Sequence, residues 1–80
     1  MTDNEAKLQS AFRTTLDLDP SADVTALTYR GIRQWDSVAH MQLIAAIEAA
    51  FDLMLDADDV IGMASYAKAR EIVARHGVML

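Results

Sequence analysis

Apolar residues recur at helical spacing at the start of the chain, and this spacing predicts a first helix over 4–16. Its single apolar stripe consists of Leu8, Ala11, Phe12 and Leu16. Three polar residues near its start can serve as the N-cap: Thr2, Asp3 and Asn4. The helix should end before Asp19-Pro20, because proline lacks a backbone donor and restricts the residue that precedes it.

Helical periodicity is lost over 20–35, which predicts a long loop for so small a domain. The loop nevertheless carries five large apolar residues: Val24, Leu27, Tyr29, Ile32 and Trp35. We therefore expect a loop that packs on the core.

The clearest helical pattern lies over 37–51, where four large apolar residues form one face and alanines raise the helix propensity. These apolar residues are Leu43, Ile44, Ile47 and Phe51. Asp36-Ser37 supplies a capping pair at the start, and Asp52 closes the helix.

Two further helices are predicted, a short one over 57–63 and a final one over 65–76. Asp56 caps the short helix, which turns Val60 and Met63 inward. The final helix ends near Gly77, a residue suited to a helix C-terminus. Its inward face consists of Tyr66, Ala69, Ile72 and Val73. No strand alternation is visible, so the predicted fold is all-α: a single domain, 1–80, forming a small up-down bundle of three main helices plus one short helix.

The amino-acid composition excludes several classes of protein and several kinds of site. The chain has 80 residues with 52% apolar and 24% charged residues, as in an ordinary globular domain. A net charge of -5 argues against a nucleic-acid binder, which needs clustered bases. The absence of cysteine excludes disulfides, thiolate nucleophiles and cysteine-based zinc sites. The polar N-terminal region resembles no signal peptide, and no stretch resembles a membrane span. We expect a soluble, cytoplasmic monomer.

The negative charge is concentrated in the middle of the chain. Between Gln34 and Ala67 there are six acids and no Lys or Arg. Such a block either forms a solvated face or attracts partners of opposite charge.

Two segments, which begin at Asp17 and Asp56, start like a calcium-binding loop. Neither has the glycine at its sixth position and the glutamate at its twelfth that such a loop requires, so no calcium site is predicted. Ser37 and His40 share one helical face, but neither histidine of the chain has an evident carboxylate partner. His40 is expected to be a surface side chain, and Ser37 is expected to have no base of its own.

Asp36-Ser37-Val38, followed by Leu43, Ile47, Glu48, Phe51 and Asp52, resembles the Asp-Ser-Leu motif and second helix of the acyl carrier proteins. The order of helices and the acidic middle are similar as well. The resemblance implies that a phosphopantetheinyl transferase attaches 4'-phosphopantetheine to Ser37. The thiol of that arm would carry an acyl group as a thioester between acyl-loading and acyl-processing enzymes. The chain itself would not be an enzyme.

The resemblance also implies roles for neighbouring residues. Asp36 would cap the helix and help to position the partner, and Val38 and Met41 would contact it. Glu48 is expected to be a solvent-facing charge of the same surface. Trp35 and a second helix rich in alanine suggest a specialised pathway, such as polyketide synthesis, over fatty-acid synthesis. An aminoacyl carrier and an unmodified helical interaction module remain alternatives.

Overall fold

The computed structural model describes residues 3–80, so the candidate N-cap Thr2 lies outside the described residues. Four helices form in this range and no strand does, apart from an isolated bridge between Thr28 and Ser65. The helices are α1 (Asp3–Thr15), α2 (Ser37–Phe51), α3 (Ala57–Gly62) and α4 (Tyr66–Arg75). The all-α prediction is confirmed, with α2 at its predicted bounds and the other helices within a residue or so of theirs.

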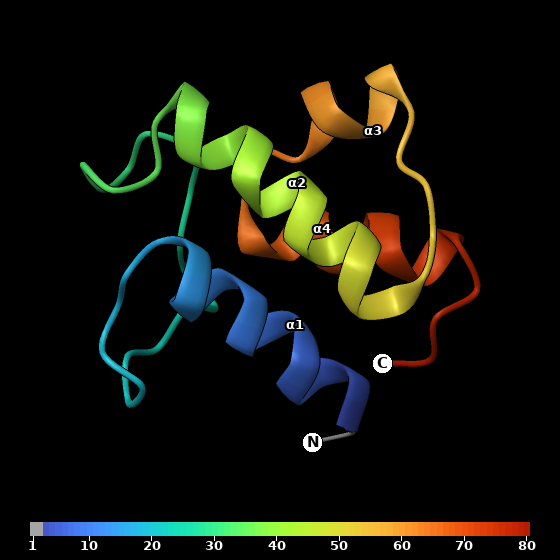
Figure 1. Ribbon diagram of the computed structural model, residues 1–80, viewed down its shortest axis with the longest axis horizontal. Coiled ribbons are helices and arrows are strands. Elements are labelled where there is room, and N and C mark those ends of the chain that lie inside the picture. The colour runs from blue at the N-terminus through green and yellow to red at the C-terminus, as the bar shows by residue number, and fades with distance from the viewer. Residues whose placement is uncertain (1–2) are drawn as a thin grey trace.

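The helices are arranged around α2, which crosses the middle of the molecule (Figure 1). α1 lies beside α2 and runs in the opposite direction, as expected for an up-down bundle (Figure 1). α4 passes behind α2 and runs in the same sense across this view, because the connection that contains α3 carries the chain back before α4 begins (Figure 1). The strict up-down alternation therefore stops at α2.

Three aromatic side chains occupy the centre of the core. The Phe12 ring meets Trp35 edge-on, with centroids 5.4 Å apart, and meets Tyr66 with centroids 5.1 Å apart. Trp35 and Val24 are fully buried, so the prediction of a loop that packs on the core is confirmed. Such aromatic contacts add to the free energy that burial alone supplies.

One predicted core residue is less buried than expected. Leu43 and Ile47 are completely buried, but Phe51 is only half-buried at the last turn of α2. The ammonium group of Lys7 lies 5.1 Å from the centroid of the Phe51 ring, a cation–π contact at the surface. Phe51 thus closes the edge of the core, where the next residue, Asp52, ends α2 in the left-handed region at φ 52°.

A polar cluster joins α1 to α4. The Tyr66 hydroxyl donates a hydrogen bond of 2.5 Å to Glu5, and Nε of Arg70 donates one of 2.8 Å. These contacts, with Tyr66 the larger, lower the pKa of the Glu5 carboxyl. Burial and the Glu5 hydrogen bond raise the pKa of Tyr66 to about 12. The pair is stable with Glu5 ionised and Tyr66 protonated.

None of the helices within 3–80 has both the length and the apolar character needed to cross a membrane.

Candidate functional site

The loop before α2 is closed by backbone hydrogen bonds that bring Ser37 to the surface. The N–H of Arg30 donates to the Trp35 carbonyl at 3.0 Å, and the N–H of Trp35 donates to the Ile32 carbonyl at 3.2 Å. The fully buried Trp35 side chain anchors this turn in the core. The two residues that follow, Asp36 and Ser37, are both exposed.

Asp36 is the N-cap of α2. Its backbone is extended, and its Oδ1 accepts a hydrogen bond of 2.9 Å from the N–H of Ala39. The carbonyl of Asp36 accepts the first helical hydrogen bond, from the N–H of His40, at 2.8 Å. The predicted capping role of Asp36 is confirmed, and Ser37 takes no part in it.

The Ser37 hydroxyl is exposed and has no hydrogen-bond partner within 3–80. In the same range, the backbone N–H groups of Ser37 and Val38 have no acceptor either. These donors belong to the first turn of a helix of 15 residues, the end that favours a negatively charged phosphate. An accessible hydroxyl at this position fits a phosphodiester linkage to 4'-phosphopantetheine.

His40 does not serve as a base for Ser37, and it is not the surface side chain that the sequence predicts. It is half-buried, and Nδ1 accepts a hydrogen bond of 3.0 Å from the indole N–H of Trp35. Since an indole nitrogen only donates, the imidazole proton lies on Nε2, which donates to the carbonyl of Val60 at 2.9 Å. Both nitrogens are therefore occupied.

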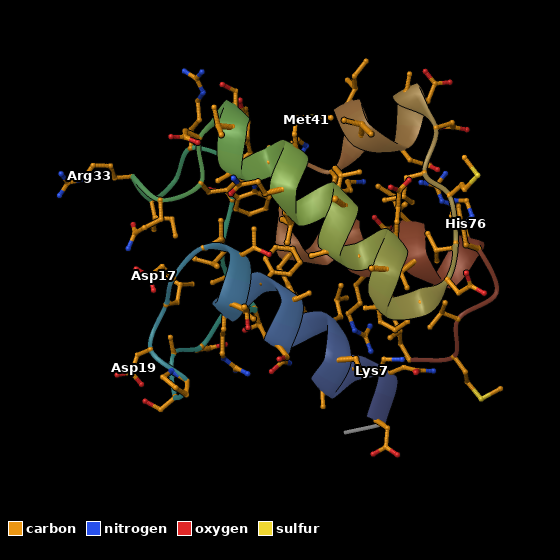
Figure 2. All side chains as sticks on the ribbon, viewed as in Figure 1. Lys7, Asp17, Asp19, Arg33, Met41 and His76 are labelled. Carbon is orange, nitrogen blue, oxygen red and sulfur yellow. The ribbon has the colours of Figure 1, made fainter. Side chains whose placement is uncertain are left out.

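An exposed apolar patch lies beside the serine. Val38 is 66% exposed and Met41 is 57% exposed, as expected for residues that contact a partner. Met41 lies on the edge of α2 nearest α3 (Figure 2). Ile61 of α3 is also exposed, at 79%, and it follows Val60, whose carbonyl is hydrogen-bonded to His40, the residue before Met41. Ile61 was not predicted to belong to this site, although an inward-facing Val60 and Met63 already leave it pointing outward.

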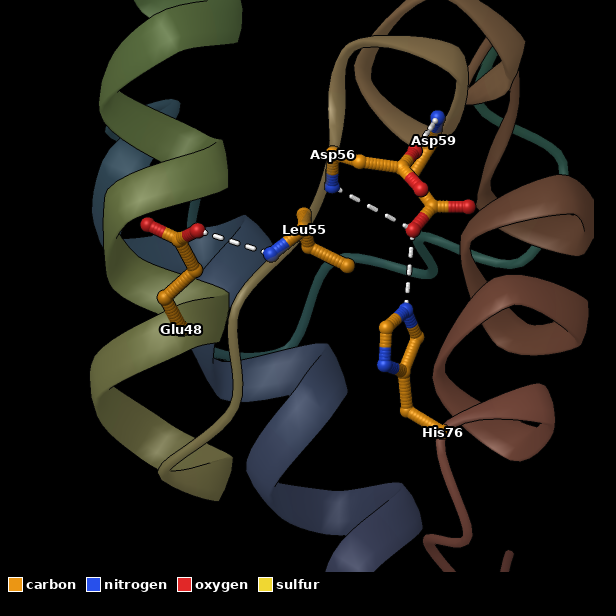
Figure 3. A network of polar contacts seen from close by, with 5 residues as sticks. All are labelled: Glu48, Leu55, Asp56, Asp59 and His76. Atoms are coloured by element: carbon orange, nitrogen blue, oxygen red, sulfur yellow. Dashed lines mark hydrogen bonds and ion pairs between the residues drawn. The ribbon is translucent and has the colours of Figure 1, made fainter.

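The side chain of Glu48 is less exposed than the sequence predicts. Its side chain is half-buried, and Oε2 accepts a hydrogen bond of 2.9 Å from the N–H of Leu55 (Figure 3). The carboxylate thus ties the connection between α2 and α3 to the last turns of α2. The prediction of a purely solvent-facing charge is wrong, because this connection folds back along α2 and needs an acceptor for its backbone.

The acids of α3 divide into structural and free ones. Asp56 and Asp59 cap each other across the first turn, and Asp59 also contacts Nε2 of His76 at 2.8 Å (Figure 3). The His76 hydrogen bond is the main cause that lowers the pKa of Asp59. His76 therefore has the carboxylate partner that the sequence did not reveal. The side chain of Asp58 is exposed and makes no hydrogen bond or ion pair within 3–80.

A cation also lies near the site. The Arg30 guanidinium lies 5.5 Å from the centroid of the Tyr29 ring. Its contact with Tyr29 and, to a lesser degree, the charge of Asp36 raise the pKa of Arg30. Arg30 could not be predicted from the sequence, because the loop that brings it near Asp36 has no periodic pattern.

Comparisons with known proteins provide no assignment. A scan against protein-family models finds no match. A search of curated proteins finds no relative. A functional assignment therefore rests on the side chains and contacts described above.

Proposed function

We propose that this chain is an acyl carrier protein and that Ser37 is the attachment site of 4'-phosphopantetheine. The observation that carries the proposal is the unoccupied hydroxyl of Ser37, exposed at the start of α2 while Asp36 does the capping. A serine that served only as a helix cap would accept a hydrogen bond from a backbone N–H of the first turn. The likeness of Asp36-Ser37-Val38 to the carrier motif supports the same conclusion.

When bound, the prosthetic group supplies the thiol that a chain without cysteine lacks, and this thiol holds an acyl group as a thioester. Ser37 contributes the oxygen that links the group to the protein. No base in the described chain is placed to accept the Ser37 proton, because both nitrogens of His40 are engaged. A phosphopantetheinyl transferase must provide that base.

Partners are proposed to dock on the surface formed by Val38, Met41 and Ile61, hereafter the apolar docking face. Two exposed acids precede residues of this face by two or three positions: Asp36 before Val38 and Asp58 before Ile61. A transferase or acyl-processing enzyme with an apolar hollow and basic rim would fit it, the charges mainly increasing the association rate. Glu48 is a weaker candidate for such contacts, since one of its oxygens is bonded to Leu55.

The proposed setting is cytoplasmic, in a specialised pathway such as polyketide synthesis. The exposed residues Gln42, Ala45 and Ala49 leave the middle of α2 without charge. A neutral helix surface selects different partners from an acidic one. An aminoacyl group is the alternative cargo, since no contact in the protein distinguishes the two.

The experiment that tests the proposal is intact-mass measurement after incubation with coenzyme A and a broad-specificity transferase. The wild-type chain should gain one phosphopantetheine, and Ser37→Ala should gain none. Ser10→Ala is the matched control, because Ser10 is an exposed helical serine of α1, and it should be loaded like wild type. Failure to load the wild type, or loading of Ser37→Ala, would contradict the proposal and favour an unmodified interaction module.

A further inference from the structure

The short helix α3 is contacted by two histidines, at its consecutive residues Asp59 and Val60. None of its six residues is fully buried, so packing alone fixes its position weakly. His76, which follows α4, contacts the Asp59 carboxylate at 2.8 Å. His40, from the first turn of α2, donates to the Val60 carbonyl at 2.9 Å. These are the two histidines of the chain.

His40 connects α3 to the fully buried Trp35 at the end of the loop. Its Nδ1 accepts from the indole N–H of Trp35 at 3.0 Å, and the two rings are stacked, with an angle of 23° between their planes. The Tyr29 ring covers His40 as well, at 5.0 Å between centroids. Trp35 is fully buried against Phe12. A continuous chain of contacts therefore runs from the core through Trp35 and His40 to the backbone of α3.

Three residues of this chain of contacts are each followed in the sequence by a residue of the proposed site. Trp35 precedes the capping Asp36, His40 precedes Met41, and Val60 precedes Ile61. The His40–Val60 hydrogen bond thus sets where Ile61 lies relative to Met41 and to Ser37 at the start of α2.

We infer that His40 is a positioning residue, which holds α3 against the first turn of α2 so that Ile61 completes the apolar docking face. The docking role rests on the proposed function; the placement of α3 does not. His40 acts as the neutral imidazole with its proton on Nε2, the only tautomer that accepts from Trp35 and donates to Val60. A docking face assembled before the partner arrives binds it more tightly, because less ordering remains to be done.

The first test measures the placement of α3 without any partner. In ¹⁵N spectra of the wild-type protein, His40 should be the Nε2–H tautomer. The indole resonance of Trp35, the one tryptophan of the chain, should shift when His40 is replaced, because its hydrogen bond to Nδ1 is lost. His40→Phe should increase hydrogen exchange at the amides of Val60 and Met63 about three- to tenfold, the range expected for one lost hydrogen bond. His40→Gln, which retains one donor and one acceptor, should show a smaller increase.

Ala11→Gly is the control, since it weakens α1 without touching α3. An Nδ1–H tautomer in the wild type would overturn the inference. So would equal α3 exchange in the His40→Phe and Ala11→Gly proteins. If His40→Phe does not fold, the tautomer of the wild type and the exchange of His40→Gln decide.

The second test measures loading by the transferase. His40→Phe should raise the KM for the carrier several-fold and leave kcat nearly unchanged, because Ser37 itself is intact while the docking face is not. A lower kcat with an unchanged KM would overturn the docking role. If the wild type is not loaded at all, the proposed function fails, and the exchange and tautomer measurements still decide the placement of α3.

Discussion

The Asp36 carboxylate accepts a hydrogen bond from the backbone N–H of Ala39 at 2.9 Å, which leaves the hydroxyl of the neighbouring Ser37 without a structural task. The two residues should therefore separate folding from loading. Asp36→Ala should lower the free energy of unfolding by about 0.5–2 kcal/mol, the usual cost of a lost N-cap. Ser37→Ala should change it by less than about 0.5 kcal/mol.

Urea melts of both variants beside Leu43→Ala provide the measurement. Leu43 is completely buried, so its truncation should cost about 2–5 kcal/mol. A Ser37→Ala protein as unstable as Leu43→Ala would show that the serine is mainly structural.

Glu48 should behave as a structural acceptor. Glu48→Lys removes the acceptor for the Leu55 N–H and should cost about 1–2 kcal/mol in a denaturant melt. Glu48→Gln keeps a side-chain oxygen in the same place and should cost less. If both proteins melt like the wild type, the contact with Leu55 contributes nothing to stability and Glu48 is free to meet partners.

Asp58 should carry the electrostatic part of docking. It is exposed and makes no hydrogen bond or ion pair within 3–80, so Asp58→Lys should lower stability by only about 0.5–1 kcal/mol, through the dipole of α3. The same change should slow transferase loading when carrier is limiting. The difference from wild type should shrink with salt, which screens charges over about 8 Å at physiological ionic strength.

The control for this charge reversal is Asp3→Lys, an equal change in the first turn of α1. Equal loading of both variants across a salt series would remove Asp58 from the docking surface.

The contact between Glu5 and Tyr66 should make stability depend on pH at both extremes. The pKa of Glu5 is lowered in the fold, so its contribution is present above 4.5 and is lost as the pH falls through the folded value. The pKa of Tyr66 is raised from 10.0 to about 12, so its contribution is lost as the pH rises through that value.

Tyr66→Phe removes the hydroxyl and should cost about 1.5–3 kcal/mol near neutral pH, as for a hydrogen bond to a charged group. Its stability should also fall less steeply than that of wild type in acid and in alkali. Parallel pH profiles for the two proteins would contradict this assignment.

Much of the fold follows from local sequence signals. Capping residues and apolar spacing predicted α2 at its bounds, and Trp35 and Val24 marked a loop that packs. These features depend on neighbours along the chain, which the sequence displays directly.

The sequence could not reveal contacts between distant segments. The Trp35–His40–Val60 hydrogen bonds and the Glu48–Leu55 hydrogen bond depend on how the connection between α2 and α3 folds back. No periodic pattern specifies that path. For the same reason a half-buried Glu48 was expected to face solvent, and His40 was expected to be at the surface.

The apolar docking face provides the final prediction. Met41→Asp should raise the KM for transferase loading at least tenfold, because a partner's apolar hollow would have to take up an unpaired carboxylate. Ile61→Asp should have a similar effect, since Ile61 is even more exposed, at 79%. Neither change should alter the melting curve by much, because both side chains already face solvent.

The matched control is Met54→Asp. Met54 is 84% exposed but lies in the connection after α2, away from Val38 and Met41 in the sequence. It should be loaded like wild type, and this contrast separates the loss of an apolar contact from a mere change in net charge. If Met54→Asp slows loading as much as Met41→Asp does, charge alone explains the effect, and the apolar docking face has no role in recognition.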